Sequence, residues 1–160
     1  PEAQLDRFML KVKIDYPDRS DELKILRLMA KSDPQFDIQV VASSDEILAV
    51  RSFLDSIHIE PVVEEYIVDI IQATRNPSLY GIDADQLIRY GASPRATIYL
   101  TMAAKAGALL KGRNYVIPDD VTELAYDILR HRVSISYEAE SEELTPDDVI
   151  KIILDAVPAP

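Results

Sequence analysis

Four segments of this 160-residue chain open with a proline where a helix would begin, and this repeated signal constrains the fold more than any other feature. Proline is favoured in the first helical turn because its missing N–H would have no partner there and its φ angle already suits a helix. The four segments are 61–75, 93–112, 118–132 and 145–157. In 61–75 the apolar residues recur at the spacing of one helical face. The chain from residue 61 onward is therefore predicted to be mostly helical.

Capping residues support the same boundaries. Ser93 and Thr145 each precede a proline and can accept a hydrogen bond from the first turn, while Gly112 follows the last periodic residue. Small residues after Ser93 would let another helix approach closely. Two earlier segments also read as helices: 18–31, whose broad apolar stripe we expect to be buried, and 43–57, which opens with a capping box. The predicted fold class is mainly α, a compact helical bundle.

Three stretches between these helices are less regular. Residues 33–42 could include a short extended run, and 76–92 form a long connection with a predicted helical turn around 83–90. The alternation in 133–140 fits either a strand or an extended arm.

Residues 9–14 are predicted to form a strand that has no partner in this chain. Phe8, Leu10, Val12 and Ile14 alternate with other residues at the period of a half-buried strand, and a Tyr-Pro pair ends the run. A single strand leaves its own backbone groups unpaired, so the partner strand is expected to lie outside this sequence. We expect 9–14 to be exposed, or to pair with a second copy.

Composition excludes several classes of function. The chain has no cysteine and two distant histidines, so thiolate chemistry is ruled out and no metal ligands are assigned. A formal net charge of −11 disfavours nucleic-acid binding. The four glycines do not fit a phosphate-binding loop. No apolar run is long enough to span a membrane and no leader is visible, so the expected location is the cytoplasm.

Arg95 is the most unusual charged residue of the sequence. It lies in the first turn of a predicted helix, where the helix dipole favours acids and the neighbouring helices carry them. A guanidinium beside free helix N–H groups would make a strong phosphate site. The alternative is a solvent-exposed arginine paired with a nearby carboxylate.

Other charged residues also allow two interpretations. Arg7, just before the orphan strand, is either a surface ion-pair partner or a finger that reaches a phosphate held by another subunit. The basic residues between 89 and 132 and the acidic residues between 138 and 148 are either solvated faces or docking surfaces. His131 lies at a helix C-terminus, where a positive charge suits the helix dipole, so its position requires no catalytic role.

Three strings together resemble the C-terminal part of the MoxR-type AAA+ ATPases. They are PEAQLDRFMLKVKIDYP (1–17), YGASPRATIYL (90–100) and RNYVIPDDVTELAYDILRHRVSISYEAE (113–140). The resemblance implies that 1–17 are the end of an α/β ATPase core, containing box VII and the last strand, and that 18–160 form a helical lid domain. The predicted strand 9–14 would be left over from that core.

The resemblance also implies roles for single residues. LDRF resembles box VII and makes Arg7 an arginine finger acting in trans on ATP of a neighbouring subunit. GASPRA resembles sensor 2 and places Ser93, Pro94 and Arg95 near the γ-phosphate of ATP bound to their own subunit. Walker A, Walker B and sensor 1 are absent from this sequence, so the chain alone is expected neither to bind ATP tightly nor to hydrolyse it.

For the parent protein, the resemblance implies an ATP hydrolase that uses ATP and Mg²⁺ to remodel or mature other proteins. Its implied partners are the missing AAA+ core, identical subunits in a hexameric ring and proteins with von Willebrand factor A domains. Two alternatives stay open: a non-enzymatic helical adaptor, and a helicase-like or DNA-binding lid, against which the net charge counts.

Overall fold

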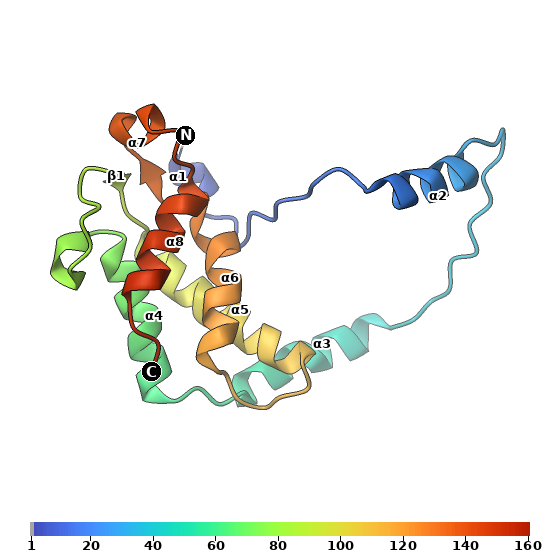
Figure 1. Cartoon of the computed structure of the whole chain (residues 1–160). Helices are drawn as coiled ribbons and strands as arrows, with labels where there is room; N and C mark the ends of the chain where they lie inside the picture. Colours follow the sequence, from blue (N-terminus) through green and yellow to red (C-terminus); the bar gives the residue numbers. More distant parts are fainter. Residues whose placement is uncertain (1) are drawn as a thin grey trace.

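Four helices form the body of the protein, and a long arm extends from it (Figure 1). The computed structural model describes the backbone of residues 2–160 and the side chains from Gln4 onward. The four helices of the body are α4 (Pro61–Ala73), α5 (Pro94–Leu110), α6 (Pro118–Leu129) and α8 (Pro146–Ala156). Helix α5 lies against both α4 and α6, and α8 packs on α4 and α6. The mainly α fold class is confirmed.

Shorter elements complete the chain. The arm carries α2 (Arg19–Met29) and α3 (Ser44–Phe53), and α3 continues into the 3₁₀ turn η1 (Leu54–Ser56). The remaining elements are α1 (Glu2–Leu5), η2 (Pro77–Tyr80), β1 (Ile88–Tyr90), β2 (Ser134–Ile135) and α7 (Tyr137–Ser141).

The predicted helix starts are confirmed, because each is set by local chemistry. Pro61, Pro94, Pro118 and Pro146 all lie in the first turn of their helices. The capping box at Ser43 forms as expected.

The core lies between the four body helices. Its largest buried side chains include Ile67, Leu100, Ile128 and Ile150, one from each helix. Small residues on α5 allow α6 to approach closely, as predicted: a Cβ added at Gly107 would lie 3.2 Å from the side chain of Leu124. Close packing of this kind accounts for most of the stability of a small helical domain.

The prediction of a strand over 9–14 is wrong for this chain. Residues 10–18 form no helix or strand, and Phe8, Val12 and Ile14 are exposed. The Lys11 N–H donates to the Asp127 carbonyl at 2.8 Å, which fastens the segment to the end of α6. The physical reason is that the described residues contain no neighbouring strand with which 9–14 could pair, so its backbone groups cannot form a sheet.

The structure also decides three further local predictions. The turn expected around 83–90 is not helical, because its last residues form β1, which pairs antiparallel with β2. Residues 133–140 do contain a strand, but it is only two residues long and is followed by α7. The extended run suggested within 33–42 forms no strand.

The arm leaves its apolar residues exposed. Neither α2 nor α3 has a buried residue, so the stripe of α2 that we expected to be buried faces solvent. Figure 1 shows α2 at the far end of the arm, away from the body. The predicted domain boundary after residue 17 stays a prediction.

Candidate functional site

The candidate site lies at the N-terminus of α5, and a close backbone contact with α4 sets its position. Thr74 at the end of α4 is buried, and its hydroxyl accepts the Ala92 N–H at 2.9 Å. The Arg75 Nε donates to the Ala92 carbonyl at 2.7 Å. A Cβ on Gly91 would lie 2.4 Å from the Thr74 carbonyl oxygen, so only glycine fits there. These contacts fix where α5 begins.

Ser93 joins the start of α5 to the N-terminal segment. As predicted it is the N-cap of α5, and its hydroxyl accepts the Arg95 N–H at 3.3 Å. The same hydroxyl donates to the Asp6 carboxylate, with both carboxylate oxygens at 3.0 Å. Pro94 occupies the first turn, where it has no N–H to leave unpaired. Asp6 was not singled out from the sequence, because its partners lie far along the chain.

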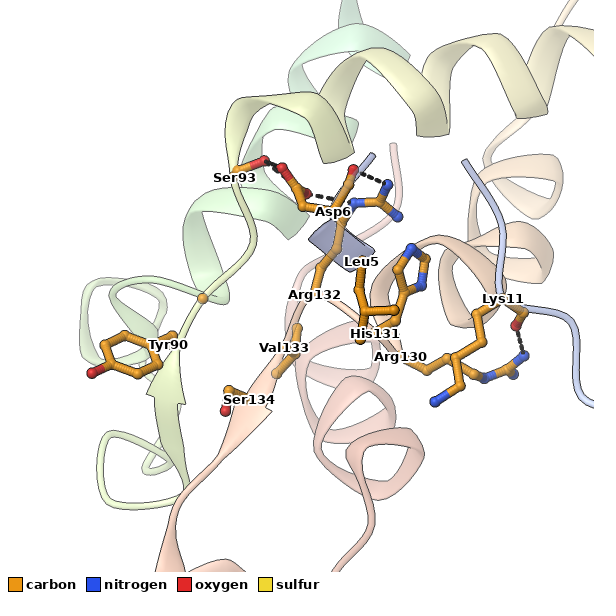
Figure 2. A pocket seen from close by; sticks show the side chains of 11 residues that line it. Leu5, Asp6, Lys11, Tyr90, Ser93, Arg130, His131, Arg132, Val133 and Ser134 are labelled. Atoms are coloured by element: carbon orange, nitrogen blue, oxygen red, sulfur yellow. Dashed lines mark hydrogen bonds and ion pairs between the residues drawn. The ribbon is translucent and has the colours of Figure 1, made fainter. Parts of the chain in front are cut away.

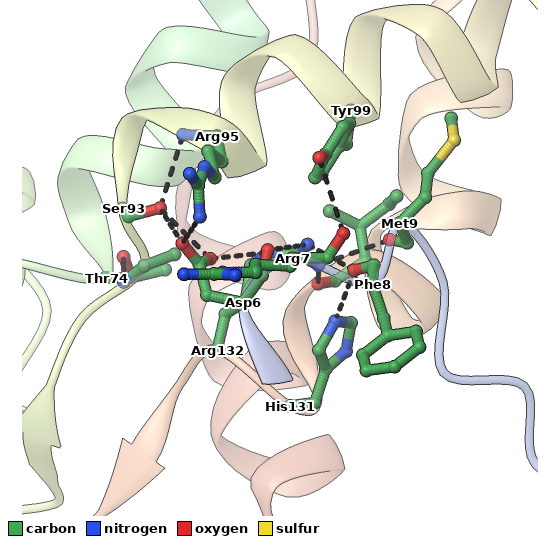
Figure 3. A network of polar contacts seen from close by, with 12 residues as sticks. Asp6, Arg7, Phe8, Met9, Thr74, Ser93, Arg95, Tyr99, His131 and Arg132 are labelled. Atoms are coloured by element: carbon green, nitrogen blue, oxygen red, sulfur yellow. Dashed lines mark hydrogen bonds and ion pairs between the residues drawn. The ribbon is translucent and has the colours of Figure 1, made fainter. Parts of the chain in front are cut away.

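Arg95 lies on the surface of this site. Its side chain is 51% exposed, and its Nη1 lies 3.5 Å from the Asp6 carboxylate (Figure 3). The exposed, carboxylate-paired arginine that we considered is therefore present, but the pair is long and solvated, and such pairs are weak. The guanidinium is not locked inside the bundle, so it remains available to an anion.

Arg7 lies beside Arg95 on the same face. Its side chain is exposed and has no hydrogen bond or ion pair among the described residues. Its carbonyl accepts the Tyr99 hydroxyl at 3.5 Å. Arg95 and Tyr99 are four residues apart on α5, and both contact the Asp6–Arg7 dipeptide (Figure 3). The structure thus brings together two arginines that are 88 positions apart in the printed sequence.

Arg132 is the functional candidate that sequence reasoning missed. Its side chain is 1% exposed and its Nε donates to Asp6 Oδ1 at 3.0 Å. Its terminal nitrogens donate to the carbonyls of Asp6, Phe8, Met9 and Ile128. The guanidinium also lies over the Tyr99 ring, 5.1 Å from its centroid. Burial lowers the pKa of Arg132, but an arginine that faces Asp6 stays charged.

His131 adds one more contact to the same segment. Its Nε2 lies 3.0 Å from the Phe8 carbonyl, and its buried Nδ1 has no partner among the described residues. Burial lowers the pKa of His131, and the charges of Arg132 and Lys11 lower it further against the opposing effect of the Phe8 carbonyl. The neutral imidazole with Nε2 protonated satisfies this geometry.

A cavity of about 380 Å³ lies behind these residues (Figure 2). Its wall includes Asp6, Lys11, Ser93, Arg130 and His131. Most of its charged groups already have partners, since Arg130 donates to Asp127, to Asp147 and to the Lys11 carbonyl. The positive side chains of the site without a close partner among the described residues are therefore Arg7 and Arg95, which lie outside the lining of this cavity, and Lys11 on its wall.

The basic residues between 89 and 132 do not form one surface. Lys111 and Arg113 both pair with Asp120, whose side chain is fully buried at the start of α6. Burial alone would raise the pKa of Asp120, but the hydrogen bonds from Arg113, the Ile117 N–H and Lys111 outweigh it, and the pKa lies below its usual value. These basic groups hold the bundle together.

The described residues show no metal site. No three His, Asp or Glu side chains among them gather closely enough to hold an ion. Within the same residues, no helix has both the length and the apolar character needed to cross a bilayer.

Comparisons with known proteins found a matching family and related sequences. Residues 82–153, which include β1 and most of the body helices, match the family described as the AAA lid domain. Over its whole length the chain is 36% identical to Chaperone MoxR1 of Mycobacterium tuberculosis and covers 42% of that protein. It is 37% identical to the uncharacterized protein YeaC of Bacillus subtilis and 31% identical to Protein MoxR of Paracoccus denitrificans, covering 48% and 51% of them. The chain thus spans about half the length of these relatives.

A solved structure has the same fold. The crystal structure of a "putative ATPase" from Cytophaga hutchinsonii superposes on the whole chain with a TM-score of 0.94 and 40% identity, and the match covers 49% of that longer chain. The superposition includes the arm, so the extended course of α2 and α3 also occurs in a protein of about twice this length.

Proposed function

This chain belongs to the MoxR-type AAA+ ATPases, as their C-terminal, lid-containing part, and from this premise we propose that it serves an ATP-hydrolysing ring by placing two arginines on a bound phosphate. The observation that carries the proposal is the shared face of Arg7 and Arg95. Arg7 has no partner among the described side chains, and Arg95 has one weak, exposed partner. Two available guanidiniums at a helix N-terminus suit a γ-phosphate.

The arrangement supports a single shared phosphate for both residues. The resemblance implied that Arg95 acts on ATP of its own subunit and Arg7 on ATP of a neighbour. Asp6 contacts Arg95 and the next residue, Arg7, contacts Tyr99 one turn further along α5, so both arginines lie at one small patch. We infer that both act in trans, on the ATP of the same neighbouring subunit.

The chemistry of these roles is electrostatic. Phosphoryl transfer to water spreads negative charge over the γ-phosphate oxygens, and a fixed guanidinium stabilises it. An arginine finger contributes about 10³–10⁵ in rate in well-studied cases. Mg²⁺ bound with ATP would neutralise charge between the phosphates. Both would be held by parts of the protein outside this sequence, because the chain has no phosphate-binding loop.

The coupled process is also a proposal. The name of the relative Chaperone MoxR1 supports a chaperone-like role for the parent protein. We propose that the parent remodels or matures partner proteins; the hexameric ring and the von Willebrand factor A domain partners are proposed from the family resemblance alone. The cytoplasm is the proposed location. The chain alone would be inactive.

Substitution in the parent protein tests the two arginines. Arg7→Ala and Arg95→Ala should each reduce ATP turnover at least about 10²-fold while the melting temperature is unchanged, because neither side chain is buried. Lys24→Ala, at an exposed basic residue of α2, is the matched control and should keep normal turnover. Wild-type turnover in both arginine variants would refute the assigned roles.

The alternative is a non-enzymatic helical adaptor. It requires that no Walker A motif is encoded in frame upstream of Pro1. Finding that motif in the same reading frame supports the ATPase, and its absence from the gene supports the adaptor.

A further inference from the structure

Arg132 uses all its hydrogen-bond donors on the N-terminal segment around Arg7 and on helix α6. A guanidinium has five N–H groups. Two of these bonds end on Asp6, at Oδ1 (3.0 Å) and at the carbonyl (2.9 Å). The others end on the carbonyls of Phe8, Met9 and Ile128. No other arginine of the described residues has so many partners.

These bonds hold the main chain on both sides of Arg7. Asp6 precedes it and Phe8 follows it, so the backbone of Arg7 is bracketed while its side chain remains exposed. Lysine could not replace this arrangement, because an ammonium is a compact charge and cannot span acceptors spread across four residues. The buried guanidinium of Arg132 therefore fixes the backbone that carries the exposed guanidinium of Arg7.

Asp6 links Arg132 to Arg95. Its carboxylate receives bonds from Ser93, Arg95 and Arg132 (Figure 3). The bond to Arg132 is 3.0 Å and largely shielded from solvent, whereas the bond to Arg95 is 3.5 Å and involves a half-exposed side chain. When a phosphate arrives, Arg95 is thus the partner that can leave, while Asp6 stays with Arg132.

We propose that Arg132 and Asp6 are positioning residues for phosphoryl transfer. Arg132 fixes the backbone on both sides of Arg7, and Asp6 holds Arg95 beside Arg7 until a phosphate competes for it. This inference rests on the proposed function, since it assumes that Arg7 and Arg95 meet ATP. It adds two groups that act through other residues and never touch the nucleotide.

The first test is Arg132→Lys in the full-length parent protein, assembled and supplied with Mg²⁺ and ATP. We expect kcat to fall about 10²-fold, the loss typical of a reacting group displaced by about 1 Å, with KM for ATP within about twofold. Arg89→Lys, at an exposed arginine, is the matched control and should keep wild-type kcat. The melting temperature of each variant reports folding.

The second test is Asp6→Asn, which preserves size, keeps an amide oxygen that can accept from Ser93 and Arg132, and removes the charge that holds Arg95. A half-exposed ion pair of this kind is worth about 0.2–1 kcal/mol, so its loss should tighten ATP binding about 1.4- to fivefold. Structural damage alone would weaken binding. In an Arg95→Ala background the gain should vanish, and Asp15→Asn, on the same segment, should show no gain in either background.

The outcomes distinguish a failure of the positioning roles from a failure of the proposed function. Wild-type kcat in a folded Arg132→Lys protein, or unchanged or weaker ATP binding in Asp6→Asn, overturns the positioning roles. If Arg132→Lys does not fold, the sign of the Asp6→Asn effect decides alone. Wild-type turnover in both Arg7→Ala and Arg95→Ala instead refutes the proposed function itself.

Discussion

Gly91 is a position at which the packing of the chain permits only glycine. The backbone of α4 passes so close to it that a side chain would meet the Thr74 carbonyl at 2.4 Å. The same contact places Ser93 and Arg95. A glycine near a helix start is common in sequences, so only the packing explains this one.

We therefore predict that Gly91→Ala destabilises the chain by about 1–3 kcal/mol, the usual range for overpacking a filled site. Gly81→Ala is the control, because Gly81 has open space around it but a φ of +70°. It should lose only about 1–2 kcal/mol, the price of a left-handed conformation. Urea denaturation of both variants measures the difference, and a smaller loss for Gly91→Ala would contradict the proposed packing.

His131 makes stability depend on pH near neutrality. Because its pKa in the folded chain lies below that of the unfolded chain, the folded state favours the neutral ring. The stability that the neutral His131 ring contributes is fully present above about pH 6.5, the ordinary pKa of histidine. It is lost as the pH falls toward the pKa of His131 in the folded chain.

The expected result is a fall in the free energy of unfolding between pH 7 and 5.5 that His131→Gln reduces. His58→Gln, which changes an exposed histidine, should leave the fall unchanged. Denaturant titrations at several pH values measure it. Identical pH profiles for wild type and His131→Gln would exclude this role.

At the scale of elements, the helices follow from local signals, but their burial does not. Helix α5 is predicted by its cap and its proline, and it packs at the centre of the body. Helix α2 has comparable signals and an amphipathic pattern, yet no residue of it is buried. The periodicity shows that a face is apolar, and the neighbouring elements decide whether it is covered.

We predict that α2 is protected only in the longer parent protein. An 11-residue helix without tertiary contacts is marginal in water. In the isolated chain its amide hydrogens should exchange at least about 10³-fold faster than those of α5, and in the parent they should become protected. Hydrogen exchange followed by mass spectrometry measures both, with α5 as the internal reference. Equal protection of α2 in the two proteins would show that the rest of the parent protein does not cover it.

At the scale of the whole molecule, the charge distribution decides whether this chain could be a DNA-binding lid. The formal net charge is −11, and many of the basic side chains between 89 and 132 are paired within the bundle. Little positive surface is left for a polyanion.

The chain should therefore show no measurable binding to duplex DNA, even at low salt. Fluorescence anisotropy with a labelled duplex, compared with a basic DNA-binding protein as positive control, tests this. Affinity that falls steeply with added salt would instead favour the DNA-binding alternative.

The sequence by itself determined the positions of the main helices, because proline starts, caps and apolar spacing act within a few residues. It also singled out Arg7 and Arg95, one by resemblance and one by its misplaced charge. The tertiary structure alone decided that Asp6 meets Ser93, Arg95 and Arg132, which lie 87, 89 and 126 residues away. Contacts over such separations depend on how α5 and α6 pack and on the path of the N-terminal segment, and no local pattern encodes that path.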